Sequence, residues 1–329
     1  MDEALLKDDL FYLYGLYRDM LVVKSIKKKY RDSVVLDNIS FNIKKGEICG
    51  FLGVNGAGKS TTINIISSYL SPDSGSVELN GIGFGNYKEY RKQFGFLPEK
   101  PPIYLDMTVQ EYLSFVYDAK GLPRKDKSKN INYSLEITQI GDARKRLINN
   151  LSKGFRQRIG IAQAVLGNPS ILLLDEPMIG LDPLQIFQMR SMFNMLKEQF
   201  TVLMSSHILS EIFEICDRIL LLSGGNIVYD GSKECFFSKD TKTSEFIITT
   251  NKSLEKSHID AILKIKGILS VCNLDNVTYN ITLKNILHEN EIKKELLLFL
   301  LGQDISINEL SPSLQNNDLE SVFLSYICD

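Results

Sequence analysis

Residues 53–61, with the sequence GVNGAGKST, are of the types that bind a phosphate chain and match the pattern G-x-x-x-x-G-K-[ST]. Glycines let successive backbone N–H groups point at one anion, and a helix that follows adds the positive end of its dipole. Lys59 can reach the terminal phosphates of a triphosphate, Ser60 can offer its hydroxyl to Mg²⁺, and Thr61 continues the helix. The pattern predicts a phosphate-binding loop.

Two adjacent carboxylates supply the chemistry that a bound triphosphate needs. Asp175 and Glu176 follow the apolar run 171–174, which predicts a strand buried on both faces. Ligands of an α/β sheet lie beyond the C-terminal ends of its strands, so both acids are expected at the ligand edge. Asp175 would bind Mg²⁺, directly or through water, and Glu176 could orient the attacking water and accept its proton.

A helix start and a lone histidine give weaker evidence for residues that contact a bound phosphate. Ser152 and Gly154 open a predicted helix that runs to about residue 166, and a hydroxyl with free N–H groups suits an anion. Most such helix starts merely cap themselves. His207 follows the predicted buried strand 201–205, which places it at the same sheet edge, although a lone histidine is commonly structural.

The elements around the loop favour a folded nucleotide site over a flexible surface loop. Residues 47–52 read as a buried strand, and residues 62–70 carry apolar side chains at helical spacing. Two earlier strands are predicted at 21–30 and 34–43. Tyr30 ends the first of them, and its ring could stack on adenine or simply pack on a neighbouring strand.

Size and charge limit the classes of protein that fit. A chain of 329 residues has room for two domains, and a net charge of −2 gives no global electrostatic case for a nucleic-acid partner. The longest apolar run, 296–301, is far shorter than the roughly 20 residues of a membrane-spanning helix. The five cysteines show no C-x-x-C spacing, which favours buried reduced thiols over a metal site or disulfides.

The two ends of the chain lie outside these patterns. Residues 1–19 lack a secretory signal, and either form a short amphipathic helix or precede the true initiator, Met20. A polar stretch, 238–244, predicts a linker. The elements expected after it follow the order βαββαβ, which is ferredoxin-like. The expected strands are 245–251, 268–274, 277–283 and 304–310, and the expected helices are 254–266 and 288–301. A final helix is expected at 318–327.

Taken together, these residues resemble the nucleotide-binding domain of an ABC transporter over about residues 21–237. The resemblance is carried by six ordered elements: a Walker A loop (53–61), a signature (151–155), a Walker B strand (171–175), a catalytic glutamate (Glu176), a D-loop (179–182) and a switch histidine (His207). It implies an α/β fold with a P-loop NTPase (RecA-like) core, an antiparallel β subdomain and an α-helical signature subdomain.

The resemblance also implies which residues act. Catalysis would fall to Glu176, His207 and Lys59, and Mg²⁺ would be held by Ser60, Asp175 and Glu99. The residues expected to bind ATP are Tyr30, Gly53, Val54, Asn55, Gly56, Ala57, Gly58, Lys59, Ser60, Thr61, Glu99, Ser152, Gly154 and Asp182.

The implied organisation is an extension (1–19), an ABC ATPase domain (20–237), the linker, and a C-terminal accessory domain (245–329) that is regulatory or dimer-stabilising. A ligand-binding role for the accessory domain is the weaker alternative. Two ATPase subunits, identical or related, would sandwich two Mg-ATP head to tail and drive a separate integral-membrane permease from its cytoplasmic face.

Several residues differ from those that are common in the family. Glu99 stands where the family often has Gln, Lys153 replaces the second Gly of the signature, and Phe155 replaces its Gln. Met178 stands where Thr or Ser is common, with no chemistry that we can assign. The forms Leu-Pro-Glu and Leu-Ser-Lys-Gly resemble bacterial exporters of drugs, antibiotics, lipids or polysaccharides.

Two other functions compete with a transporter subunit. A soluble ABC-type ATPase acting on ribosomes or DNA usually carries two ATPase halves or a long coiled-coil insertion, whereas this chain has one Walker A loop and no heptads. A regulator that binds nucleotide without hydrolysing it is disfavoured by Glu176 and His207. The transported cargo is not encoded here, because the permease would select it.

Overall fold

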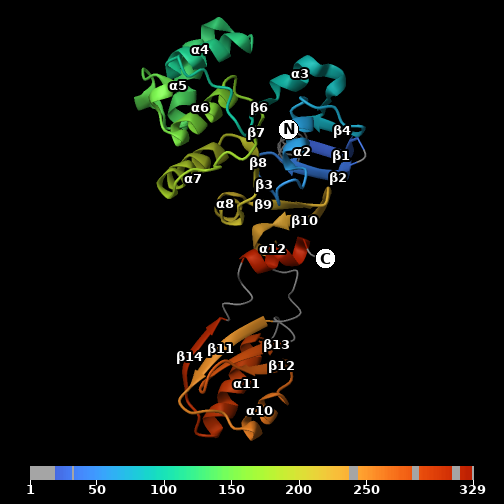
Figure 1. The fold of residues 1–329 in the computed structure, drawn as a ribbon, viewed down its shortest axis with the longest axis vertical. Coiled ribbons are helices and arrows are strands. Elements are labelled where there is room, and N and C mark those ends of the chain that lie inside the picture. Colours follow the sequence, from blue (N-terminus) through green and yellow to red (C-terminus); the bar gives the residue numbers. More distant parts are fainter. Residues whose placement is uncertain (1–18, 32, 237–243, 284–288, 313–318, 328–329) are drawn as a thin grey trace, which may run out of the picture. The chain divides into compact units, whose positions relative to one another are not determined.

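The computed structural model describes residues 19–31, 33–236, 244–283, 289–312 and 319–327. The chain divides into two compact units, Met1–Lys233 and Glu234–Asp329, drawn in Figure 1. The N-terminal helix expected within residues 1–19 and nearly all of the linker expected at 238–244 fall outside the described residues. No helix in the described part is long and apolar enough to span a bilayer.

A six-stranded sheet in the order β10-β9-β3-β8-β7-β6 forms the centre of the first unit. Its strands are β3 (Ile48–Gly53), β6 (Phe94–Leu97), β7 (Ile171–Leu174), β8 (Thr201–Ser206), β9 (Arg218–Ser223) and β10 (Asn226–Ser232). All neighbours are parallel except β9 and β10. Because parallel strands end at one edge, the loops after β3, β7 and β8 converge there.

A second, antiparallel sheet in the order β2-β1-β4-β5 packs beside this core. Its strands are β1 (Asp19–Tyr30), β2 (Ser33–Lys44), β4 (Ser74–Leu79) and β5 (Ile82–Gly83). Phe41 of β2 contacts Phe51 of β3 with ring centroids 5.8 Å apart, so the two sheets share one hydrophobic core. This is the predicted antiparallel β subdomain, and it carries Tyr30 at the end of β1.

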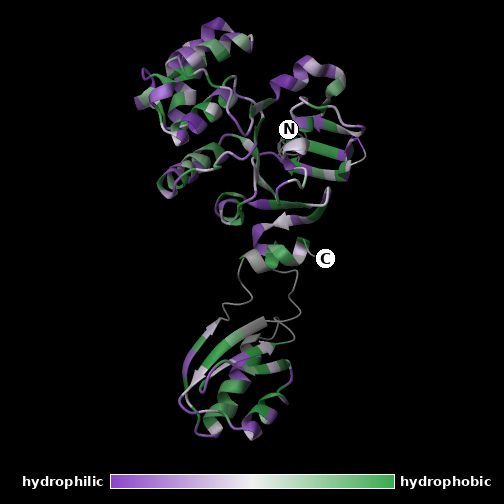
Figure 2. Ribbon diagram, viewed as in Figure 1, coloured by the Kyte–Doolittle hydropathy of each residue, from purple (hydrophilic) through white to green (hydrophobic). Residues whose placement is uncertain are grey.

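Three helices build a separate hydrophobic cluster, the predicted helical subdomain: α4 (Val109–Ala119), α5 (Lys127–Ile137) and α6 (Lys153–Val165). Helix α4 begins with a capping box, in which the Glu111 N–H donates to Thr108 Oγ1 and the Thr108 N–H donates to the Glu111 carboxylate. The other helices of this unit are α2 (Lys59–Ile66), α3 (Tyr87–Lys92), α7 (Pro183–Lys197) and α8 (Leu209–Ile215). Helix α3 is largely hydrophilic (Figure 2).

The second unit follows the predicted βαββαβ order. Its elements are β11 (Ser244–Thr250), α10 (Lys256–Ile262), β12 (Ile268–Asn273), β13 (Thr278–Leu283), α11 (Glu289–Gly302) and β14 (Ile307–Pro312), preceded by the short α9 (Lys233–Phe236) and followed by α12 (Leu319–Ile327). The sheet order is β12-β13-β11-β14 and every pair is antiparallel. Within this unit, the Tyr326 hydroxyl of α12 donates to the Phe236 carbonyl.

The cysteines agree only in part with expectation. Cys49 and Cys216 are buried free thiols, and burial raises the pKa of both. Cys235 and Cys272 are exposed, so the prediction of burial is wrong for these two. Both lie in mixed rather than purely apolar sequence, and Cys272 belongs to an edge strand, where alternate side chains face solvent. Cys328 lies outside the described residues.

Candidate functional site

The phosphate-binding loop connects β3 to α2, and its glycines are required by its shape. Gly58, the residue before α2, has φ +109°, a backbone conformation that residues with a Cβ rarely adopt. A Cβ at Gly58 would also lie 2.6 Å from Leu36 Cδ2 and 3.0 Å from the Val35 carbonyl oxygen. The loop therefore fits closely against β2 only with glycine at this position.

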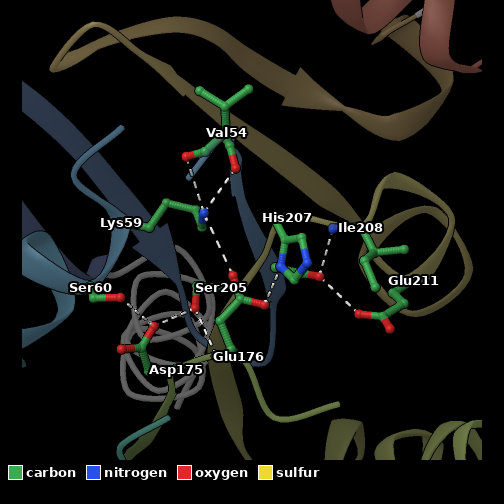
Figure 3. A network of polar contacts seen from close by, with 11 residues as sticks. Val54, Lys59, Ser60, Asp175, Glu176, Ser205, His207, Ile208 and Glu211 are labelled. Carbon is green, nitrogen blue, oxygen red and sulfur yellow. Dashed lines mark hydrogen bonds and ion pairs between the residues drawn. The ribbon is translucent and has the colours of Figure 1, made fainter. Parts of the chain in front are cut away.

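Lys59 folds back into the loop that precedes it (Figure 3). Its ammonium donates to the Gly53 carbonyl at 2.8 Å and to the Val54 carbonyl at 3.4 Å, and lies 3.5 Å from Glu176 Oε1. The side chain is only 6 % exposed. A buried cation so held can exchange these carbonyl contacts for phosphate oxygens, which form stronger, charge-assisted hydrogen bonds.

Asp175 lies at the end of β7, beneath the first turn of α2. Its Oδ1 accepts hydrogen bonds from the Ser60 hydroxyl at 3.1 Å and from the Ser205 hydroxyl at 2.6 Å. Burial raises the pKa of Asp175; both serine hydrogen bonds oppose the rise, and the charges of Glu176 and Glu99 add to it. A divalent cation at this carboxylate would offset those two neighbouring negative charges.

The oxygen atoms around Ser60 fit Mg²⁺. A hydroxyl and a carboxylate face each other there, and both are the hard oxygen ligands that Mg²⁺ prefers. Among the residues that the structure describes, no group of three or more His, Cys, Asp or Glu side chains could hold a metal ion by itself. Binding would therefore depend on phosphate oxygens and water for the remaining ligands, which is usual for Mg²⁺ at a nucleotide.

Glu176 is held on two sides by nitrogen groups. The His207 Nδ1–H donates to Glu176 Oε2 at 2.9 Å, while Lys59 approaches Oε1 from the other side. The Glu176 N–H donates to the Ser205 hydroxyl at 2.8 Å. Its backbone has φ +48°, a strained conformation for a residue other than glycine, of a kind that clusters at functional sites.

A cavity of about 580 Å³ joins these groups, within the usual size range of ligand pockets. Its lining contains Tyr30, Val35, Asn55, Gly56, Gly58, Lys59, Ser60, Thr61, Glu99, Glu176, Ile179 and His207. Tyr30 is half exposed at this cavity. Most residues predicted to bind ATP are thus brought together, with Gly53, Val54 and Ala57 completing the loop behind them.

Besides Gly53, Val54 and Ala57 of the loop, three predicted nucleotide ligands from other parts of the chain do not line this cavity: Ser152, Gly154 and Asp182. The Ser152 hydroxyl accepts from the Phe155 N–H at the start of α6, and Asp182 accepts from the Gln185 N–H at the start of α7. A Cβ at Gly154 would lie 3.0 Å from the Gln185 side chain. Within one chain these residues serve as helix caps and packing contacts.

Sequence reasoning missed Ser205, Ser206 and Glu211. Ser205 connects both acids, because its hydroxyl donates to Asp175 and accepts from the Glu176 N–H. Ser206 donates to the buried carboxylate of Glu211 at 2.8 Å. The available signal was the pair of serines that ends β8 directly before His207.

A second, larger hollow of about 1300 Å³ lies beside the nucleotide cavity, between α3 and the helical subdomain. Five basic side chains line it against two acidic ones, together with four aromatic side chains: Lys88, Arg91, Lys92, Lys100, Lys120, Glu99, Asp175, Tyr69, Tyr87, Phe94 and Phe96. Arg91 stacks over the Tyr87 ring at 4.4 Å. Glu99 belongs to the lining of both hollows.

Known proteins with similar sequences are ATP-binding subunits of transporters. The ABC transporter family profile matches residues 36–179. The linearmycin resistance ATP-binding protein LnrL of Bacillus subtilis is 32% identical over 321 residues, covering 93% of this chain and 97% of LnrL. The bacitracin transport ATP-binding protein BcrA of Bacillus licheniformis is 35% identical over 241 residues, covering 71% and 78% of the two chains.

Solved structures with a similar fold match the first unit. An ATP binding subunit of an ABC transporter superimposes with a TM-score of 0.60 at 31% identity, over 67% of this chain and 92% of the other. A bacterial ABC transporter cassette, MJ0796, determined as a dimer, gives 0.58 at 26% identity, over 65% and 98%.

Proposed function

This chain belongs to the ABC transporter ATP-binding family and is an ATP-hydrolysing subunit, and we propose that it works as one half of a dimer that drives a separate membrane permease. The observation that carries the proposal is the position of Glu176, between Lys59 and His207, in the same cavity as the phosphate-binding loop. A proton acceptor beside a phosphate cradle is what hydrolysis of a triphosphate needs.

The proposed roles follow from the contacts. The loop N–H groups and Lys59 bind the phosphates, and Tyr30 stacks on adenine. Ser60 and Asp175, with Glu99, would hold Mg²⁺, which would neutralise charge on the triphosphate.

Glu176 takes the proton of the attacking water at its carboxylate. His207 holds that carboxylate in place through its Nδ1–H. Both residues are close enough to the loop to act on the terminal phosphate of one nucleotide.

We assign Ser152, Gly154 and Asp182 to the nucleotide of a second ATPase subunit. They do not line their own chain's cavity, and Ser152 and Asp182 open α6 and α7, whose N-terminal dipoles favour a negatively charged ligand. A second subunit that brings these helix ends over the cavity would complete the cage around the terminal phosphate. The subunits are identical or closely related chains.

We assign the larger hollow to the permease. Its excess of basic side chains and its aromatic lining suit a helix that carries acidic and apolar residues. Glu99 would transmit the state of the nucleotide to that helix, because it lines both hollows. The subunit would then lie on the cytoplasmic face of the membrane, and the antibiotic-resistance and antibiotic-transport names of its relatives favour export.

The first test measures the ATPase activity of the purified chain. Release of phosphate is expected with Mg²⁺ and should fall to background when EDTA removes the metal, because the metal would neutralise charge on the triphosphate. Adding excess Mg²⁺ should restore the rate. Hydrolysis that continues in EDTA would contradict the assigned metal site, and no hydrolysis in Mg²⁺ would favour a nucleotide-gated regulator.

The second test probes the permease contact by reversing one charge. Arg91→Glu is expected to reduce co-purification with the membrane partner at least about tenfold, because unlike charges become like charges across the contact. ATP binding should persist, since Arg91 does not line the nucleotide cavity. Lys125→Glu makes the same charge change on an exposed residue outside the hollow and should have no effect. Equal losses in both variants would exclude this docking surface.

A further inference from the structure

Helices α7 and α8 pack together beside the site, and each follows a loop with a residue that lines the nucleotide cavity. Helix α7 follows Ile179, and α8 follows His207; both residues line the nucleotide cavity. Arg190 of α7 forms an ion pair with Glu214 of α8. This contact joins the two helices that follow those loops.

Glu211 lies one turn before Glu214 on α8 and is buried, with 3 % of its surface exposed. Its Oε2 accepts from the Ser206 hydroxyl at 2.8 Å, and the Ser206 Oγ in turn accepts from the Ile208 N–H at 3.0 Å. Ser206 and Ile208 are the residues on either side of His207. Figure 3 shows His207, Ile208 and Glu211 of this network. Glu211 therefore fixes the turn that presents His207 to Glu176.

Two buried polar atoms here lack hydrogen-bond partners among the described residues: Glu211 Oε1 and Arg190 Nε. One is an acceptor on a carboxyl group and the other a donor on a guanidinium group, so each is the kind of partner that the other needs. Leaving a buried acceptor or donor unpaired costs about 1–3 kcal/mol, and more for charged groups. The two atoms belong to helices that already touch through Arg190 and Glu214.

The charge of Glu211 depends on the groups that face it. Burial raises the pKa of its carboxyl, and the Ser206 hydrogen bond opposes that rise. The Glu176 carboxylate raises the pKa further, whereas His207 and Arg190 lower it. Arg190 lies near this carboxyl because its ion-pair partner, Glu214, is one turn away on the same helix.

We propose that Arg190 exchanges its ion-pair partner between Glu214 and Glu211, and that the Arg190–Glu211 pair holds His207 in the position that supports Glu176 during ATP hydrolysis. Glu211 and Glu214 are three residues apart on one helix, hence about 5–6 Å apart at Cβ, a distance that one arginine side chain spans by changing rotamers. Glu214 is half exposed, so water can replace the arginine when it leaves.

The exchange would connect the arrival of a second subunit with the position of His207, and it rests on the function proposed above. Movement of the loop before α7, when a second subunit arrives, would carry Arg190 toward Glu211 and fix the turn that bears His207. Neither Arg190 nor Glu211 lines the cavity, so both are positioning residues rather than catalytic ones.

The test is a double-mutant cycle on kcat for ATP hydrolysis in the full chain. Arg190→Gln and Glu211→Gln are each expected to lower kcat about tenfold and to change KM less than about twofold, because the nucleotide contacts are intact. The double variant should be no slower than the slower single variant, since residues that act as one pair are not additive. Losses that multiply to about a hundredfold would overturn the proposal.

Glu214→Gln separates exchange from simple packing. Removing Glu214 leaves Arg190 free to pair with Glu211, so kcat should equal or exceed that of the wild type. A loss as large as that of Arg190→Gln would mean that the Glu214 pair is the functional one and would overturn the exchange. Arg190→Lys, which keeps the charge, should recover part of the kcat lost in Arg190→Gln.

The pH profile of kcat provides a readout that a purely structural role would not change. Arg190→Gln removes a positive charge, which raises the pKa of Glu211 and moves the acid limb to higher pH. In a Glu211→Gln background the same substitution should leave that limb in place; an equal shift there would overturn the proposal. If the wild type shows no ATPase activity, the proposed function fails; if it is active and all variants match it, only this inference fails.

Discussion

Replacing Glu176 with Gln is expected to lower kcat for ATP hydrolysis about 10²–10⁴-fold, the range that a positioned general base contributes. Gln has nearly the same shape and can still contact Lys59 and His207, but it cannot accept the proton of the attacking water. The phosphate-binding loop is unchanged, so affinity for ATP should stay within a few-fold of the wild type.

The same variant should reveal the dimer. Without hydrolysis the terminal phosphate remains in place, and Glu176→Gln is expected to elute as a dimer in Mg-ATP and as a monomer without nucleotide. Size-exclusion chromatography with light scattering measures this directly. Glu136→Gln makes the same change at an exposed position of α5 and should behave as the wild type does. Undiminished hydrolysis by Glu176→Gln would remove this residue from its assigned role.

Replacing Lys59 with Gln is expected to weaken ATP binding at least about a hundredfold. Hydrogen bonds to charged groups contribute roughly 1.5–3 kcal/mol each, and Lys59 would make two with the phosphates. Gln keeps a donor for the Gly53 carbonyl, so the loop should stay folded. Glu176 would then lack its buried cationic neighbour.

Titration calorimetry with ATP, in the presence of Mg²⁺, measures this loss. Lys125→Gln, which neutralises an exposed lysine outside the cavity, is the matched control and should bind as tightly as the wild type. Thermal unfolding of both variants in the absence of ATP distinguishes a binding defect from a folding defect. Affinity within about threefold of the wild type would contradict a phosphate contact by Lys59.

The parts of the site that sequence could predict are those encoded by short, local patterns. The phosphate-binding loop and the acids after β7 depend on spacing within a few residues, and parallel strands necessarily bring their ends together. The sequence therefore predicts that Lys59 and Glu176 lie close together. In the structure they are 3.5 Å apart, although more than a hundred residues separate them in the chain.

Other features depend on tertiary contacts that no local pattern reports. The charged run 124–129 favours a solvated face or loop by composition, but it does not indicate that α5 begins within it at Lys127 and buries Ile131 and Leu135 against its neighbours. The partners of Arg190 depend on how α7 and α8 pack, and neither helix indicates this by itself. In the proposed dimer, the positions of Ser152 and Gly154 relative to a nucleotide would depend on a second chain.

The left-handed backbone at position 176 affects how this site can degenerate. Asp and Asn adopt that conformation more readily than Glu does, so neither substitution would add backbone strain. Asp would hold its carboxylate one methylene short, and Asn would carry no base at all. A catalytically silent copy can therefore arise without added backbone strain at this position, and in a pair of duplicated subunits the inactive member could serve as the partner of an active one.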